Sequence, residues 1–232
     1  LTPSPLFSTG VLGASLLTLG GTDQQKQTYL PQIVDGTVTT ALALEESNRH
    51  APHSIETVAK KSGDNFIISG TKNFVIDGHS SKLLIVAART EGEKNDASGI
   101  TLFLVESDHQ DVEITKTSMV DSRNAANIKF NDVEVSSENI LGEENNGASV
   151  LEVVLDRAQI AISAEMLGNA SQAFDLTLEY LKERKQFGAV IGTFQALQHR
   201  AAEMYSELEL TKSSVIAACN AVDQNSNDLG RM

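Results

Sequence analysis

Between residues 135 and 147 the spacing of apolar residues changes from the alternation typical of strands to the spacing typical of helices. Short apolar runs bounded by turn residues fill residues 37–135, whereas apolar residues over 147–222 recur every three or four positions. A run of strands followed by a run of helices is typical of α+β proteins rather than of alternating α/β folds. The sequence therefore predicts an α+β fold.

The strand-like region contains several short runs separated by turn signals such as Ser62–Asp64 and Asp77–Gly78. Strands at this spacing predict an antiparallel barrel or a sandwich of roughly 100 residues. The expected strands cover residues 37–44, 56–59, 65–70, 72–76, 82–88, 100–105, 112–114 and 127–135.

Two short helices are expected before the strands. The first ends at Gly20–Gly21, because glycine accepts a positive φ at little cost. Thr22 is expected to cap the second helix, which Asp35–Gly36 ends.

Two long helices are expected after the strands, over about 147–184 and about 194–222. Gly168 inside the first is expected to mark a close helix crossing, since glycine costs about 1 kcal/mol in a helix interior. Two helices do not close a bundle, so we expect helices from a continuation of the chain or from a partner subunit to complete it.

The composition excludes several classes of function. A formal net charge of −13 argues against nonspecific binding to nucleic acid or to an anionic membrane surface. No apolar run approaches the ~20 residues of a membrane-spanning helix, so no membrane insertion is expected. Cys219 is the single cysteine, which excludes an intrachain disulfide, and its apolar surroundings predict a buried thiol.

A compact set of charged, amide and aromatic residues lies between the two long helices, at Arg184–Gly188 and Phe194–Gln195. Together with the order and spacing of other segments, this set resembles the acyl-CoA dehydrogenase family. The other segments are Gly36–Thr37 with Ala41–Glu45, Phe66–Gly78, Phe130–Val135 and Asn139–Gly142.

The resemblance covers nearly the whole chain and implies a division into three parts. Residues 1–36 correspond to the end of an N-terminal helical domain, 37–142 to an antiparallel β-barrel middle domain, and 143–232 to the first part of a helical-bundle domain. Further helical regions are expected upstream and downstream, with the usual catalytic glutamate beyond Met232.

The same resemblance implies the chemistry. Family members use FAD to remove two hydrogens from the α and β carbons of an acyl-CoA and usually pass the electrons to an electron-transfer flavoprotein. It also implies another subunit of the same fold, and a location in the cytoplasm, or in the mitochondrial matrix in a eukaryote.

In the family the helix–helix corner reaches the FAD of a neighbouring subunit. Arg184, Phe187 and Gln195 match the residues that contact the pyrophosphate and the adenine part. A guanidinium binds phosphate oxygens through two parallel hydrogen bonds, which lysine cannot copy. The alternative is that Arg184 only closes a helix C-terminus, where cations are favoured.

The resemblance is weaker for the chain's own flavin, for which Leu44, Phe74 and Ile76 are the candidate contacts. The family usually has Thr-Glu-Pro and then Gly-Ser-Asp after the first strand of the barrel, whereas this chain has Leu44–Glu46 and then Arg49–Ala51, so only the glutamate, Glu45, matches. Ile76 replaces a threonine and cannot donate a side-chain hydrogen bond, although backbone amides can still serve.

The substrate channel is also altered. Family members often have Leu-Asp-x-x-Arg on the helix that lines the acyl-CoA channel, and Asp156 matches, whereas Gln159 replaces the arginine. Some branches have a catalytic glutamate at the position of Ala158, so no catalytic residue is assigned in this chain. We also considered His50 and His53 with two glutamates as metal ligands, but this spacing in a proline-containing loop favours a solvated loop and no metal.

Two functions follow. The first is an FAD-dependent acyl-CoA dehydrogenase. The second is a non-catalytic or diverged subunit of the same fold that completes a partner's FAD site, because residues directed to a neighbour's FAD are kept while those for its own are replaced.

Overall fold

The computed structural model describes residues 4–121 and 123–224. By contacts within the chain it divides into two compact units, with the boundary after Leu155, and each unit is described by itself. The division into 1–36, 37–142 and 143–232 stays a prediction.

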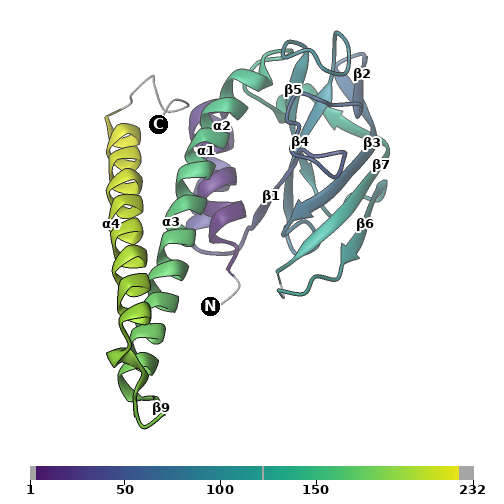
Figure 1. Cartoon of the computed structure of the whole chain (residues 1–232). Helices are drawn as coiled ribbons and strands as arrows, with labels where there is room; N and C mark the ends of the chain where they lie inside the picture. Colours follow the sequence, from purple (N-terminus) through teal and green to yellow (C-terminus); the bar gives the residue numbers. More distant parts are fainter. Residues whose placement is uncertain (1–3, 122, 225–232) are drawn as a thin grey trace. The chain divides into compact units, whose positions relative to one another are not determined.

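A mixed sheet forms most of the first unit (Figure 1). Its strands run in the order β6-β7-β3-β2-β4-β5-β8, with β1 also paired to β4. The strands are β1 (Thr40–Ala43), β2 (Val58–Ser62), β3 (Asn65–Ile76), β4 (Leu83–Arg89), β5 (Ile100–Glu106), β6 (Val112–Thr117), β7 (Ala125–Ser136) and β8 (Ile140–Leu141).

The expectation of a purely antiparallel sheet is wrong at two pairings. β1 pairs with β4 in parallel, and so does the first residue of β2. The excursion through β2 and β3 between β1 and β4 is long enough for the crossover that a parallel pair requires. Among the described residues no pairing joins β6 to β8, so the strands form an open path and not a closed barrel.

The core lies on the inner face of this sheet. Every residue of β4 is buried, which fits a central strand covered on both faces. Phe66 of β3 and Phe103 of β5 are fully buried, with ring centroids 5.2 Å apart. Burying one such side chain stabilises the fold by about 1.5–3 kcal/mol, so these rings hold opposite halves of the strand path together.

Strand β3 is one continuous strand, whereas the sequence predicts two. Its pairing with β7 shifts register between Lys72 and Val75, where β3 has one extra residue. This bulge reverses the side-chain alternation: Phe66, Ile68 and Lys72 are buried, but the next buried residue is Val75. Phe74 is therefore 49% exposed on a strand whose alternation would bury it.

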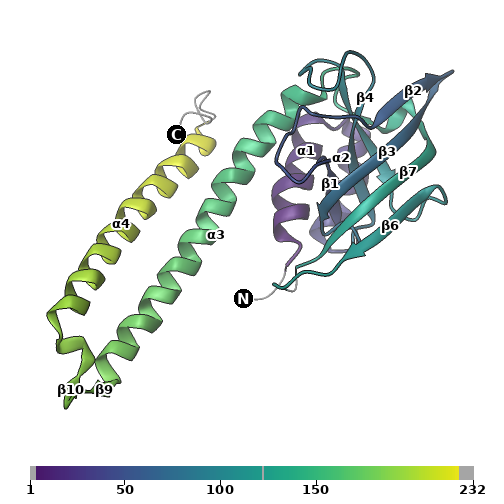
Figure 2. The same ribbon diagram turned by 45° about the vertical axis from the view of Figure 1, so that its right-hand side comes forward.

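The N-terminal helices are η1 (Leu6–Gly13), which is a π-helix, α1 (Ala14–Gly20) and α2 (Asp23–Val34). They lie on the side of the sheet where β1 is found (Figure 2). α1 ends where expected, but Gly21 has a φ of −67°. The small residue is needed because a Cβ there would lie 2.5 Å from the carbonyl oxygen of Leu17.

Helix α2 begins as the sequence predicts. Thr22 accepts a hydrogen bond from the main-chain N–H of Gln25, and the Gln25 side chain accepts one from the N–H of Thr22. The Gln25 amide also donates to the carbonyls of Glu138 and Ile140, both at 2.9 Å. These bonds connect α2 to η2 (Ser137–Asn139) and to β8 at the edge of the sheet.

The second unit contains most of α3 (Gly147–Glu183) and α4 (Gln195–Asp223), which run side by side as a hairpin (Figure 2). Between them lie β9 (Lys185–Gln186), β10 (Ala189–Val190) and η3 (Ile191–Thr193). No helix of the described residues is both long and apolar enough to cross a membrane.

Helix α3 is continuous through Gly168, and a Cβ there would meet nothing within 4 Å, so no helix of the described residues makes the expected close crossing. The expectation of a buried Cys219 is wrong, because its side chain is exposed on α4.

Candidate functional site

The loop that follows β1 directs three main-chain carbonyl oxygens towards β3. The carbonyl oxygen of Leu44 accepts from Lys72 Nζ at 3.0 Å. The carbonyl of Glu45 accepts from the main-chain N–H of Asn73 at 2.7 Å, and that of Glu46 accepts from the Asn73 side chain at 2.6 Å. Three consecutive carbonyls are thus directed at two adjacent residues of β3.

This arrangement directs main-chain N–H groups away from β3. In a trans peptide the C=O and the following N–H point in opposite directions. The N–H groups of Glu45, Glu46 and Ser47 therefore face away from Lys72 and Asn73, and none donates a hydrogen bond to another residue in the described ranges. We call residues 45–47 the amide strip.

A buried ion pair supports the amide strip. Lys72 Nζ lies 2.7 Å from Glu46 Oε1, and the two side chains are 0% and 11% exposed. Burial lowers the pKa of Lys72 to about 8, and the charge of Glu46 opposes this effect. Burial alone would raise the pKa of Glu46, but Lys72 and hydrogen bonds with Thr57 and Glu56 lower it overall.

Glu46 also accepts hydrogen bonds from two main-chain N–H groups at the far end of the same loop. Glu46 Oε2 accepts from the N–H of Glu56 at 2.6 Å, and Oε1 accepts from that of Thr57 at 2.9 Å. Thr57 lies so close to β3 that a Cβ at Gly70 would be 2.5 Å from its Oγ1. Glycine at this position allows β3 and the loop to approach each other.

Glu45, which precedes Glu46, contacts residues of the same loop. Glu45 Oε1 lies 2.6 Å from His50 Nδ1, and Oε2 accepts from the N–H of Ala51 at 3.0 Å. His53 Nε2 lies 3.5 Å from Glu152 Oε1 at the start of α3. Among the described residues, no group of three or more His, Cys, Asp and Glu side chains is arranged to hold a metal ion.

The bulge in β3 borders the amide strip, because Phe74 follows Asn73. Phe74 has a φ of 53°, which is costly for a residue with a Cβ. Its N–H donates to Asn127 Oδ1 at 3.0 Å. Asp77, three residues on, also has a positive φ, of 57°, and accepts a 2.5 Å hydrogen bond from Ser8 of η1. Backbone strain of this kind is often found at functional sites.

The structure separates the three residues predicted to contact the chain's own flavin. The Leu44 side chain is 5% exposed and belongs to the core, so only its main chain reaches the strip. Phe74 is half exposed beside the strip, and Ile76 is half-buried at the end of β3, paired with Ala125. Their contacts with a flavin stay predictions.

The corner between α3 and α4 is a small hairpin that the sequence does not predict. β9 pairs with β10, and the two residues between them, Phe187 and Gly188, have φ values of 53° and 78°. Positive φ at both central positions defines a type I′ turn, in which asparagine or glycine is normally first. Phe187 is 93% exposed, and its ring forms a T-shaped pair with that of Phe194, with 6.4 Å between centroids.

Arg184 and Gln195 flank this hairpin. Arg184 follows the last residue of α3, and its carbonyl accepts from the N–H of Ile191 at 2.8 Å. Its exposed side chain forms no hydrogen bond or ion pair with any other residue in the described ranges, so it does not cap the carbonyls of α3. Gln195 is exposed at the first position of α4. The hairpin thus brings Arg184, Phe187 and Gln195 to one end of the two helices.

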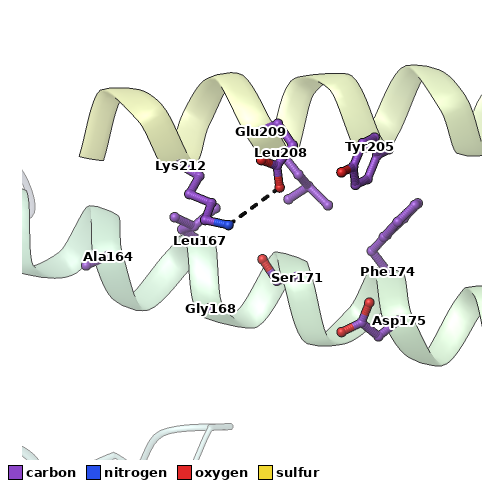
Figure 3. Close-up of a pocket in the computed structure, with 10 residues that line it drawn as sticks. All are labelled: Ala164, Leu167, Gly168, Ser171, Phe174, Asp175, Tyr205, Leu208, Glu209 and Lys212. Atoms are coloured by element: carbon purple, nitrogen blue, oxygen red, sulfur yellow. Dashed lines mark ion pairs between the residues drawn. The ribbon is translucent and has the colours of Figure 1, made fainter. Parts of the chain in front are cut away.

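A groove of about 450 Å³ lies between α3 and α4. Figure 3 shows Phe174 and Tyr205 facing each other from the two helices, with ring centroids 6.3 Å apart. Gly168 contributes to its wall, and the Lys212–Glu209 ion pair of α4 lies on its rim (Figure 3). Asp156, the candidate substrate contact, is half-buried near the start of α3 and does not line this groove.

Lys72 and Asn73 are the site residues that the sequence analysis missed. The alternation Phe66, Ile68, Lys72 puts Lys72 on the inward face of its strand. A lysine on an inward face requires a buried acceptor, and Glu46 in the preceding loop was the available partner. That signal could have identified the ion pair.

Comparisons with known proteins agree with this geometry. The sequence model of the family domain "Acyl-CoA dehydrogenase, middle domain" matches residues 41–133. The sequence model of "Acyl-CoA dehydrogenase, C-terminal domain" matches residues 145–232. A probable acyl-CoA dehydrogenase of Bacillus subtilis, YngJ, is 35% identical over 92% of this chain and 57% of its own length. The mitochondrial isovaleryl-CoA dehydrogenase of Pongo abelii is 34% identical over 90% of this chain and 50% of its own length.

The solved structures agree as well. Butyryl-CoA dehydrogenase from Megasphaera elsdenii superposes with a TM-score of 0.92 at 30% identity, covering 97% of this chain and 60% of that one. The chain spans between 50% and 60% of the length of these relatives. Since two domain models of one family match successive parts of the sequence and the fold is shared, this chain belongs to the acyl-CoA dehydrogenase family.

Proposed function

We propose that this chain forms part of an FAD-dependent acyl-CoA dehydrogenase, which removes two hydrogens from the α and β carbons of an acyl-CoA thioester. The observation that carries the proposal is the amide strip at residues 45–47, whose N–H groups lack partners within the described chain. The flavin ring system has carbonyl oxygens and ring nitrogens that accept such hydrogen bonds.

The residues present fit the cofactor through main-chain groups. The N–H groups of the strip can hold flavin acceptors, and the half-exposed Phe74 ring offers an apolar contact beside them. Ile76 can contribute only van der Waals contact and main-chain groups. Bound FAD supplies the two-electron acceptor of the reaction, and the chain's own residues bind and orient it.

The substrate class follows from the relatives. Two of them are named for the acyl-CoA esters on which they act, isovaleryl-CoA and butyryl-CoA. We assign an acyl-CoA substrate to this chain on that basis. The family resemblance adds Asp156 as a candidate contact, an electron-transfer flavoprotein as electron acceptor, and the cytoplasm, or the mitochondrial matrix in a eukaryote, as the location. No residue of the chain is assigned as the catalytic base.

The colour of the purified chain tests this proposal. A yellow protein that releases FAD on denaturation, and whose flavin absorbance bleaches when an acyl-CoA is added without oxygen, supports it. Butyryl-CoA and isovaleryl-CoA are the first substrates to try. A colourless protein that takes up no added FAD rules the proposal out.

A second candidate function is supported by the corner hairpin. Phe187 is held at an unfavourable positive φ and is 93% exposed, while the Arg184 side chain has no partner within the described residues. A strained, exposed aromatic beside an unpaired guanidinium suits binding to a partner's ligand. The chain would then complete the FAD site of another subunit of the same fold.

Mixing experiments separate the two functions. If the chain is colourless alone but raises the flavin content or the activity of a co-purified homologous subunit, the second function holds. If the chain alone binds FAD and bleaches with an acyl-CoA, the first holds.

A further inference from the structure

The ion pair between Lys72 and Glu46 has a high desolvation cost. Both side chains are almost completely buried, and their charged atoms lie 2.7 Å apart. Replacing a buried ion pair with apolar residues of similar size is often neutral or stabilising. A contribution to overall stability therefore does not account for this pair, and a role in fixing a particular local conformation does.

The hydrogen bonds of the pair identify the segment that it fixes. Lys72 binds the carbonyl of Leu44, and Glu46 binds the N–H groups of Glu56 and Thr57. One pair of side chains thus joins β3 to both ends of the loop at residues 45–57. It also determines which way the Leu44 peptide faces, and with it the first N–H of the amide strip.

We propose that Lys72 and Glu46 are positioning residues, which hold the amide strip at residues 45–47 in the orientation that binds the flavin. This inference rests on the proposed function. Neither side chain is required to touch the cofactor, since both act through the main chain of Leu44–Ser47.

Other charged groups surround Lys72. Glu46 and Glu45 come from the loop, and Arg89 comes from β4. Arg89 itself donates to the carbonyls of His53, Lys94, Asp96 and Ser98, which secures the middle of the same loop and the one after β4. When Lys72 loses its proton, Glu46 still accepts hydrogen bonds from the N–H groups of Glu56 and Thr57 but no longer has a cation beside it. The carbonyl of Leu44 then faces a neutral amine in place of a charged donor.

The test compares K72M, E46Q and the double variant K72M/E46Q with the wild-type chain. FAD affinity is measured by titration of flavin absorbance and fluorescence, and the free energy of unfolding is measured in parallel by urea denaturation. K72M leaves an unpaired carboxylate, so both quantities should fall. The double variant removes both charges, so stability should return towards the wild-type value, whereas FAD affinity should stay about tenfold weaker.

Two comparisons exclude a merely structural role. K61M removes an exposed lysine that faces Glu144 on the surface, and it should leave FAD affinity unchanged. FAD affinity of the wild-type chain should also decline as the pH rises through about 8, where Lys72 deprotonates, whereas the double variant should show no such decline. If FAD affinity recovers together with stability in the double variant, the inference is wrong.

Amide hydrogen exchange provides a readout that needs no flavin. In K72M, peptides covering residues 44–57 should exchange faster, while peptides covering residues 100–106 of β5 should not change. Unchanged exchange over 44–57 overturns the inference whether or not FAD binds. A wild-type chain that binds no FAD at all overturns the proposed function, and FAD bound equally by all variants overturns the inference alone.

Discussion

The main-chain N–H of Phe74 donates a 3.0 Å hydrogen bond to the Asn127 side chain, across the bulge that joins β3 to β7. This bond holds Phe74 at a φ of 53° and turns its side chain from the core face to the exposed face. The position of Phe74 beside the candidate flavin site thus depends on an asparagine 53 residues away.

Replacing Asn127 with alanine should destabilise the bulge. The N–H of Phe74 loses its acceptor, and we expect the free energy of unfolding to fall by about 1 kcal/mol. Urea denaturation measures the change. Asn131 of the same strand is also exposed and its side chain forms no hydrogen bond with the described residues, so N131A is the matched control. Equal effects of N127A and N131A would contradict this account of the bulge.

Replacing Phe187 with asparagine should stabilise the corner hairpin. Asparagine tolerates the positive φ of a type I′ turn, and a side chain that does not costs about 1 kcal/mol there. F187A is the matched control, because it removes the ring but keeps the backbone cost. We expect F187N to exceed F187A in melting temperature, although both should weaken binding to a partner's FAD. Identical melting temperatures would show that the turn is not strained.

Local sequence signals predicted the elements whose partners are close in the chain. The Thr22–Gln25 capping box begins α2, and the spacing of apolar residues gave the two long helices, α3 and α4. These interactions span three or four residues, so the sequence alone contains them. The turn at Gly63 between β2 and β3 was readable for the same reason.

The candidate site depended on contacts that the local sequence does not contain. The bulge at Phe74 is held by Asn127 on another strand. The local sequence does not contain this contact, so it predicts two strands where the structure has the single strand β3. Lys72 finds Glu46 only after the loop folds back onto β3. The resemblance to a family identified Arg184, Phe187 and Gln195, but not the turn conformation that exposes Phe187.

Gln25 should matter more than an ordinary capping residue. Its side chain accepts from the N–H of Thr22 and donates to the carbonyls of Glu138 and Ile140. Q25A removes all three hydrogen bonds at a position that is 7% exposed, and we expect a loss of about 2 kcal/mol. Gln24 is exposed on the same helix, so Q24A should change stability by less than about 0.5 kcal/mol. If the free energy of unfolding falls no more in Q25A than in Q24A, the Gln25 side chain does not stabilise the packing of α2 against β8.

The buried lysine predicts an unusual dependence of stability on pH. The pKa of Lys72 is lowered from 10.5 to about 8 in the folded chain. Between these values the unfolded chain holds a proton that the folded chain has released, so the contribution of Lys72 to the free energy of unfolding rises with pH. Each pKa unit of lowering corresponds to about 1.4 kcal/mol. Glu46 affects stability at low pH, because its pKa is lowered in the folded chain. The stability that this carboxylate contributes is present above pH 4.5 and is lost as the pH falls through the lowered pKa.

Urea denaturation of the wild-type chain and of K72M from pH 7 to pH 10 measures this effect. The wild-type free energy of unfolding should rise relative to that of K72M above about pH 8. Two parallel curves would mean that Lys72 does not titrate in this range. This rise has the opposite sign to the decline expected for FAD affinity, so the two measurements separate the stability of the fold from the orientation of the amide strip.

Arg184 should not tolerate lysine if it binds a partner's FAD. A guanidinium can donate two parallel hydrogen bonds to phosphate oxygens, whereas an ammonium acts as a point charge. R184K should therefore lower the flavin content of the assembled protein about tenfold, and R184M should lower it further. Because the Arg184 side chain is exposed and unpaired within the described residues, neither change should alter the melting temperature of the chain alone. R200K, on the exposed face of α4, is the matched control. Full flavin content in R184K would remove Arg184 from the proposed contact and leave Phe187 and Gln195 as its candidates.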